Sequence, residues 1–319
     1  MKTFFAFFSL FFLFLNALFS EGFSISILPN CGITHGVLEE KIYNSSKNHE
    51  IISLLEWEKN LFLLGADAEI SFKSFFVTAG FEIALPAECG EMRDSDWLNQ
   101  KDRTMKTRYS FGENIAQNNV GFSLSFGRHF DFDTIFSIIP IFQTKYTFDS
   151  FERKNAEGFY SDDTKWYFDE TSKHYPSEYY WSEEKQKYVR SVLAGVGYER
   201  YSIVFWVGSK VQFSISKKCT ISFGAFFSAY SYTDATDTHH GSETKYRQTQ
   251  SAVFSKIKIP FEIEFDLSKR LSLNFNAHAL FGKTEKGELF VNGELNKAQP
   301  SGSTVQEILA KIGIKILAF

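Results

Sequence analysis

Two pairs of side chains in this sequence have the types and spacing that proton chemistry needs. Asp94 and Asp96 are separated by one residue, and so are Asp237 and His239. In an extended segment the side chains of residues i and i+2 point the same way, so each pair can converge on one point. Both pairs lie where a segment typical of a β-strand borders a long polar loop. These four residues therefore form the candidate catalytic set.

The chemistry that this set suggests is the activation of a water molecule. A carboxylate beside a histidine holds the imidazole in one tautomer and makes it more basic, which suits a general base near neutral pH. Two facing aspartates tend to share a proton, because both cannot ionise cheaply at close range. A water held between the pairs could be deprotonated and aimed at a carbonyl group. Since an acidic loop alone is usually just solvated, this chemistry requires a frame that brings the two pairs together.

Period-two alternation dominates the chain, and this pattern predicts β-strands. It is clear in residues 221–229, 253–265 and 271–281. A soluble β-sandwich would alternate as well. Here large apolar residues occupy one face, while small, polar or charged residues occupy the other. That division favours a wall with lipid outside and a polar lumen inside.

The predicted connections alternate between short turns and long polar loops. Short turns fit residues 73–74, 131–133, 216–218 and 266–270, and long loops fit residues 38–47, 87–106, 152–187, 233–242 and 283–303. Short turns at one end and long loops at the other are typical of outer-membrane barrels, which favour an even strand number. We therefore expect residues 21–319 to form one domain. Its predicted fold is all-β, a ten-stranded antiparallel up-and-down transmembrane β-barrel, and we expect it to be a monomer.

Composition agrees with this fold class. The formal net charge of −4 gives no reason to expect a nucleic-acid partner. The mean hydropathy of −0.19 is too low for a membrane protein built of many helices. The 37 Phe and 14 Tyr residues suit a barrel whose outer face is apolar.

The first twenty residues are typical of a secretory signal peptide. Lys2 is followed by an almost entirely apolar run, residues 4–19, and cleavage is expected near Ser20. An uncleaved membrane anchor is the alternative. The chain has three cysteines, Cys31, Cys89 and Cys219. They are far apart in the sequence and show no CxxC spacing, so we expect at most one disulfide and no metal site.

The two acidic motifs resemble those of the omptin family of outer-membrane proteases. Residues 91–97 resemble the family segment around its aspartate pair, including the preceding Met and the following Trp, and residues 237–239 match its aspartate–x–histidine motif. The resemblance extends over essentially the whole mature chain. Shorter similarities lie at residues 55–57, 197–198, 245–247 and 313–315.

The resemblance implies a ten-stranded barrel with its active site in an outward-facing groove. Asp237 and His239 would form the dyad that activates water, and Asp94 and Asp96 would form the couple on the opposite wall. The resemblance thus implies an aspartic-type endopeptidase, for which neither an acyl-enzyme nor a metal is expected. The resemblance also implies that the protein lies in the cell outer membrane, with its active site facing the extracellular side, and cuts peptides or proteins at basic residues.

The resemblance further implies residues that receive the substrate. Glu40 matches the acidic residue of the family that receives the basic side chain, and Glu39 takes its place if the alignment shifts by one residue. Met92 and Asp234 complete the expected substrate-binding set. Where the family has a second specificity aspartate this chain has Ala235, and Asp234 replaces it only by turning inward. We therefore expect cleavage after basic residues, with a weaker preference over neutral side chains than in the family.

No cofactor is expected, although lipopolysaccharide or another outer-membrane lipid is an expected activator by resemblance. The family binds that lipid through basic and polar residues on the outer wall, a pattern partly kept here, with Lys145 as the best match. The main alternative function is a non-catalytic outer-membrane barrel that acts as an adhesin or surface-binding protein. A porin comes third, because ten strands leave little room for an open channel.

Overall fold

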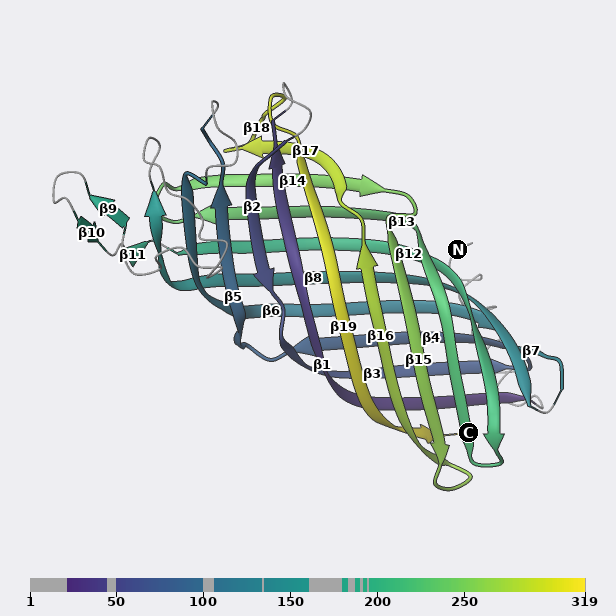
Figure 1. The fold of residues 1–319 in the computed structure, drawn as a ribbon. Helices are drawn as coiled ribbons and strands as arrows, with labels where there is room; N and C mark the ends of the chain where they lie inside the picture. The colour runs from purple at the N-terminus through teal and green to yellow at the C-terminus, as the bar shows by residue number, and fades with distance from the viewer. Residues whose placement is uncertain are drawn as a thin grey trace, which may run out of the picture.

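The computed structural model describes residues 22–44, 50–99, 106–133, 135–160, 180–182, 187–189, 192–193 and 195–318. Every regular element in these residues is a strand, and ten wall strands form one closed antiparallel ring (Figure 1). The predicted barrel is therefore confirmed. Within the described residues no helix is long and apolar enough to cross a membrane. The predicted signal peptide, residues 1–20, lies outside the described part of the chain.

The wall strands are of two kinds. Some run the height of the barrel without a break: β1 (Phe23–Tyr43), β6 (Arg108–Arg128), β8 (Phe136–Tyr160), β12 (Val196–Ser216), β13 (Cys219–His239) and β19 (Ser301–Leu317). The others consist of two strands in line: β3 (Leu61–Phe72) with β2 (Ile51–Glu58), β4 (Phe75–Ala84) with β5 (Ala87–Asp96), β15 (Lys256–Asp266) with β14 (Thr244–Ala252), and β16 (Leu271–Gly282) with β17 (Glu285–Val291). Short strands lie in the connections: β7 (Phe130–Asp131), β9 (Tyr180–Ser182), β10 (Lys187–Val189), β11 (Val192–Leu193) and β18 (Glu294–Leu295).

The breaks in the two-part walls have local causes. Pro86 separates β4 from β5, and proline has no backbone N–H to donate to a ladder. Phe254, between β14 and β15, has a φ of 50°, in the left-handed region that a strand does not use. Beyond these breaks β2 pairs with β5 and β14 pairs with β17, so the ring continues toward the end that carries the site.

The first and last wall strands close the barrel. β1 pairs antiparallel with β19, from Ser26 opposite Leu317 to Ile42 opposite Ser301. Closure removes the free edges that would otherwise pair with other chains. The chain therefore needs no other element to satisfy its backbone hydrogen bonds at this seam.

Exposed apolar residues mark the part of the wall that faces lipid. On β6 they are Phe122, Leu124 and Phe126, which are 50, 56 and 51% exposed, and the intervening Ser123 and Ser125 line the interior. β6 has 21 residues, whereas a tilted strand crosses the bilayer with about 9–11. The wall therefore extends beyond the apolar band. We call β2, β5, β14, β17 and the parts of the unbroken strands level with them the projecting half.

Much of the projecting half was predicted as loops, and this part of the prediction is wrong. The predicted loops began at residues 38, 87, 152, 233 and 283, but β1 continues to Tyr43, β5 begins at Ala87, β8 continues to Tyr160, β13 continues to His239 and β17 begins at Glu285. The outer faces of these segments are polar because water lies outside the wall above the lipid. Their polar composition therefore hides the strand pattern. Residues 161–179 of the longest predicted loop lie outside the described residues.

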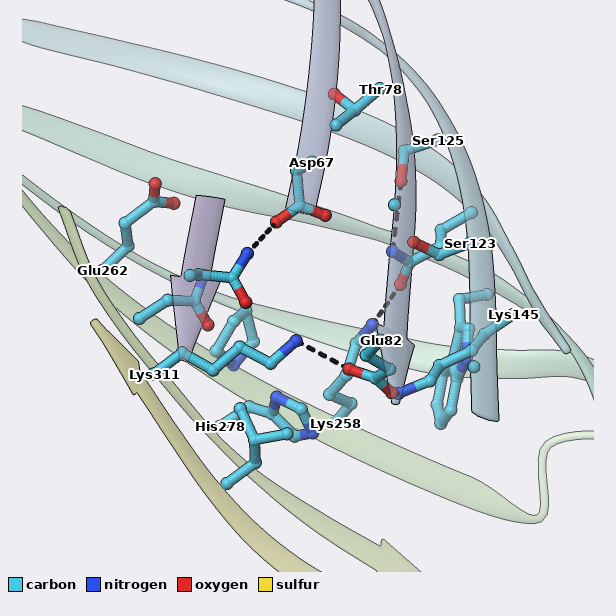
Figure 2. A pocket seen from close by; sticks show the side chains of 18 of the residues that line it. Asp67, Thr78, Glu82, Ser123, Ser125, Lys145, Lys258, Glu262, His278 and Lys311 are labelled. Carbon is cyan, nitrogen blue, oxygen red and sulfur yellow. Dashed lines mark hydrogen bonds and ion pairs between the residues drawn. The ribbon is translucent and has the colours of Figure 1, made fainter. Parts of the chain in front are cut away.

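The lower half of the barrel encloses a polar cavity of about 410 Å³. Charged side chains from opposite walls meet across it, as Figure 2 shows. The Glu82 carboxylate there accepts from the ammonium groups of Lys145 at 2.5 Å and Lys311 at 2.6 Å. Lys145 was predicted on the outer wall as a lipid-binding residue. It faces inward because side chains alternate along β8, and its neighbour Tyr146 packs outside against Phe122.

A buried apolar cluster lies above this cavity, at the base of the projecting half. Its residues include Leu38, Trp57, Met92, Phe151 and Tyr198, each at most 1% exposed. The Trp57 ring stacks on those of Tyr198 and Phe151, with ring centroids 5.0 and 6.1 Å apart. These side chains form the floor on which the candidate site lies.

Candidate active site

Strand register brings Glu40 and Asp94 to one level of one wall. Glu40 on β1 lies opposite Leu55 on β2, Leu55 lies opposite Asp94 on β5, and Asp94 lies opposite Ser110 on β6. The side chains of Glu40 and Asp94 are 1 and 6% exposed, so both point into the barrel. Two acidic residues far apart in the sequence therefore share one face, with Leu55 between them.

The facing wall carries the predicted dyad. Asp237 on β13 lies opposite Tyr198 on β12 and Tyr246 on β14, and His239 follows two residues later on the same strand face. The His239 Nε2 atom lies 2.9 Å from the Asp237 Oδ2 atom. The imidazole also meets the Tyr246 ring edge-on, with centroids 5.2 Å apart. The ring is therefore held on two sides, and the side chain is still 28% exposed.

The charges around His239 favour its protonated form. Burial lowers its pKa, but the hydrogen bond to Asp237, the Asp237 charge and the Asp94 charge together raise the pKa above its ordinary value. Because Asp94 belongs to the opposite wall, this effect also indicates that the two walls face each other across a short gap. His240, the next residue, is exposed and does not share this environment.

The carboxyl of Asp94 is the counterpart on the first wall. Burial raises its pKa above the ordinary range, and the nearby charge of Asp96 raises it further. His239 and Arg153 act in the opposite direction. The predicted pairs are thus brought together, because Asp94 is influenced by Asp96 on its own strand and by Asp237 and His239 across the groove.

Glu40 is buried beside the dyad, near Tyr198 and Arg200, and we call this position the Glu40 pocket. The Tyr198 hydroxyl donates to its Oε1 atom at 3.0 Å, while its Oε2 atom has no hydrogen-bond partner among the described residues. Burial and the charge of Asp237 raise the pKa of Glu40 to about 8, although Tyr198 and Arg200 oppose the rise. Glu39, the alternative, points to the outer face, where Lys41 donates to it at 2.6 Å.

The prediction that Asp234 joins this pocket is wrong in orientation. Its carboxylate accepts two hydrogen bonds from Arg247 on the outer face of the wall, at 2.9 and 2.6 Å. Ala235, which is 1% exposed, takes the inward position instead. The cause is alternation, because Ala235 shares the inward face with Asp237 and its neighbour Asp234 cannot. One carboxyl, that of Glu40, is therefore left in the pocket.

Met92 lies two residues before Asp94 on the same strand face. It is fully buried in the apolar floor, so it supports the site from beneath. The Arg153 Nη1 atom approaches its sulfur at 3.5 Å and donates to the Ser110 hydroxyl at 2.6 Å. Sequence patterns did not identify Arg153 or Arg200, whose positions depend on pairing between distant strands.

The sequence also predicted no metal site and at most one disulfide. Within the described residues no three His, Cys, Asp or Glu side chains are grouped so that they could hold a metal ion. Cys31, Cys89 and Cys219 are all free. Burial raises the pKa of the Cys89 thiol to about 12, which suits a packing role rather than a reactive one.

Comparison with known proteins identifies the family. The model of the Omptin family matches residues 21–298. Among solved structures, the outer membrane protease OmpT from Escherichia coli matches with a TM-score of 0.73 and 12% identity, over 92% of this chain and 96% of that chain. The translocator domain of the autotransporter NalP from Neisseria meningitidis matches with a TM-score of 0.40 and 9% identity, over 95% of this chain and 91% of that one. No curated protein matches the sequence.

The two kinds of match support different statements. At 12% identity the likeness to OmpT establishes the barrel fold and nothing finer. The family model, by contrast, covers most of the chain and includes both acidic motifs. The chain therefore belongs to the Omptin family, a family of outer-membrane proteases.

Proposed function

We propose that this protein is an outer-membrane endopeptidase that hydrolyses peptide bonds with a water molecule activated between the Asp237–His239 dyad and the Asp94–Asp96 couple. The observation that carries the proposal is the 2.9 Å contact between His239 and Asp237, within electrostatic reach of the buried Asp94 carboxyl. A base and a shared acidic proton thus lie on opposite sides of one gap. A peptide lying along that gap would present its carbonyl group between them.

The proposed reaction uses a water and no covalent enzyme intermediate. Neutral His239 takes one proton from the water, and Asp237 stabilises the imidazolium that results. The oxygen of the water bonds to the carbonyl carbon, while the proton shared by Asp94 and Asp96 forms a hydrogen bond to the developing oxyanion. His239 then gives its proton to the leaving amine as the C–N bond breaks, which restores the neutral imidazole.

Substrate choice is assigned to Glu40. Its buried carboxyl lies beside the dyad and can approach the side chain next to the cleaved bond. A basic side chain would pair with the ionised carboxylate, and this charge-assisted bond would offset the cost of its desolvation. We propose that the site faces the extracellular side and takes peptides or proteins with basic residues. Outer-membrane lipid, including lipopolysaccharide, remains the proposed activator.

The test is a refolding experiment with the mature chain, residues 21–319, in detergent. A fluorogenic peptide library, assayed with and without lipopolysaccharide, should be cleaved, and mass spectrometry should locate the cuts, with basic residues favoured once Glu40 is ionised. Serine-directed acylating reagents should leave the activity intact, and no covalent adduct should form. Asp237→Asn is the matched control, and its activity should be strongly reduced. Peptide binding by the folded barrel without any cleavage would contradict the proposal and favour the non-catalytic surface-binding barrel.

A further inference from the structure

Arg200 lies in the floor of the Glu40 pocket. It sits on β12 two residues from Tyr198, is 4% exposed, and is directly opposite Ala235 in the register of β12 and β13. Its Nη2 atom donates to the Thr233 hydroxyl at 3.4 Å. Where an aspartate at position 235 would add negative charge to the pocket, this chain therefore has a methyl group with a buried guanidinium beside it.

The carboxylate nearest to Arg200 is shared with a second cation. The Arg200 Nη1 atom lies 3.5 Å from one oxygen of Asp149, while the Lys59 ammonium lies 3.0 Å from the other. Lys59 also lies 3.3 Å from Glu307. Two cations thus meet two carboxylates below the pocket, and no surplus negative charge is left to attract a third cation from above.

The groups that face Glu40 come from several elements. β12 contributes Tyr198 and Arg200, and β13 contributes Asp237. The neighbours of Glu40 on β2 and β19 are Leu55 and Ser303, which carry no charge. Burial and the Asp237 carboxylate favour the protonated acid, so the pKa of Glu40 is about 8. At neutral pH Glu40 is therefore a buried carboxylic acid whose Oε2 atom has no hydrogen-bond partner among the described residues.

We propose that Arg200 and Ala235 make this pocket a site for an uncharged primary-amide side chain, that of Gln or Asn, which it accepts at least as well as a cationic one at neutral pH. This inference rests on the proposed function. A carboxylic acid and a primary amide form two complementary hydrogen bonds: the acid O–H donates to the amide oxygen, and the amide N–H donates to the acid carbonyl oxygen. A cation in the same place meets a neutral acid, and the carboxylates below are already neutralised by Arg200 and Lys59.

The preference should change with pH in a defined direction. Above about 8 the Glu40 carboxyl loses its proton, and the resulting anion attracts a cation. Cleavage beside Arg relative to Gln should therefore rise with pH and level off once Glu40 is ionised. The ratio of kcat/KM for two substrates isolates this change, since the titrations of His239 and Asp94 affect both substrates alike.

The experiment uses the refolded mature chain and peptides that are identical except for one side chain: Arg, Lys, Gln or Met. At pH 6 the kcat/KM for Gln should equal or exceed that for Arg, and Gln should be better than the similarly long but apolar Met. Between pH 6 and pH 9 the Arg/Gln ratio should rise about tenfold, within the range of roughly 10–150-fold for one charge-assisted hydrogen bond. In Glu40→Gln the ratio should not vary with pH.

Substitutions at Arg200 and Ala235 assign the effect. Arg200→Gln should raise the Arg/Gln ratio about tenfold, whereas Arg200→Lys, which keeps the charge, should leave it within about threefold. Ala235→Asp leaves the buried guanidinium in place, so it keeps the test decisive if Arg200→Gln does not fold. It should raise the ratio less, and the double variant with Arg200→Gln should raise it most, by about 100-fold.

The outcomes separate this inference from the proposed function. A wild-type preference for Arg over Gln above about 100-fold at pH 6, unchanged in Arg200→Gln and Ala235→Asp, would overturn the inference and leave the protease proposal standing. A folded barrel that cleaves none of the peptides would overturn both. Equal ratios for Arg200→Gln and Arg200→Lys would show that the guanidinium charge is not the determinant, and this would also overturn the inference.

Discussion

The lumen and the groove are both rich in charged side chains, but the charges are paired in the lumen and crowded with like charges in the groove. In the lumen, the Glu82 carboxylate meets the ammonium groups of both Lys145 and Lys311. In the groove, Glu40, Asp94 and Asp237 crowd together, and one oxygen each of Glu40 and Asp237 has no hydrogen-bond partner among the described residues. Paired charges hold a wall together, whereas burial and crowding raise the pKa values of Glu40 and Asp94. The comparison shows that the reactive region is marked by an excess of carboxyl groups over cations, and not by the total number of charged groups.

The largest expected effect lies in the groove. His239→Ala should lower kcat/KM by roughly 10²–10⁴-fold, the usual size of a general-base contribution. His240→Ala is the matched control, because this exposed neighbour lies outside the dyad, and it should cost far less. Kinetics on protein whose folding is verified by its anomalous migration on an unboiled gel would check this. Equal losses for the two variants would refute the assignment of the base.

In the lumen the same kind of substitution should affect stability instead of rate. Glu82→Gln leaves two ammonium groups without their carboxylate, and removing one partner of a buried ion pair costs roughly 3–5 kcal/mol. The temperature at which the folded form is lost on a gel should fall clearly. The kcat/KM of the fraction that remains folded should stay within about twofold of wild type. A large loss of rate in that fraction would erase the distinction between the two regions.

The pH dependence sharpens the groove side of the comparison. His239 acts as a base only when neutral, so kcat/KM should fall as the pH drops through its raised pKa. Asp237→Asn removes the carboxylate charge that raises this pKa, so the acid limb of the residual activity should move to lower pH. A pH–rate profile checks this shift. An acid limb that does not move would mean that Asp237 does not set the protonation of His239.

The smallest expected effect lies on the outer face of the projecting half. Asp234→Ala breaks an ion pair with Arg247, whose side chain is 52% exposed, and such surface pairs contribute only about 0.2–1 kcal/mol. Activity and the Arg/Gln ratio should remain within about twofold of wild type. Steady-state kinetics with the paired peptides measures both. Loss of the preference in Asp234→Ala, with Glu40→Ala unchanged, would mean that the pocket is built from the β13 side.

Local patterns in the sequence determined the architecture and the chemistry of the main groups. Alternation along the strands and the alternating lengths of the connections predicted a ten-stranded barrel, since both are properties of consecutive residues. The spacing of Asp94 with Asp96, and of Asp237 with His239, predicted two pairs that each share a strand face. Composition led to a wrong prediction of loops where the wall extends beyond the lipid, because a strand with water outside it has the polar character of a loop.

Only the tertiary structure decided which groups meet. Glu40 receives its hydrogen bond from Tyr198, 158 residues away, and this contact exists only because the ring closes. The register of β13 places the Ala235 side chain inside the barrel and the Asp234 side chain outside. A shift of this register by one residue would reverse the two orientations. Closure also set Arg200 beneath the pocket and Asp94 across from His239. The sequence supplies the ionisable groups, but their charge states depend on burial and on neighbours that only the closed barrel brings together.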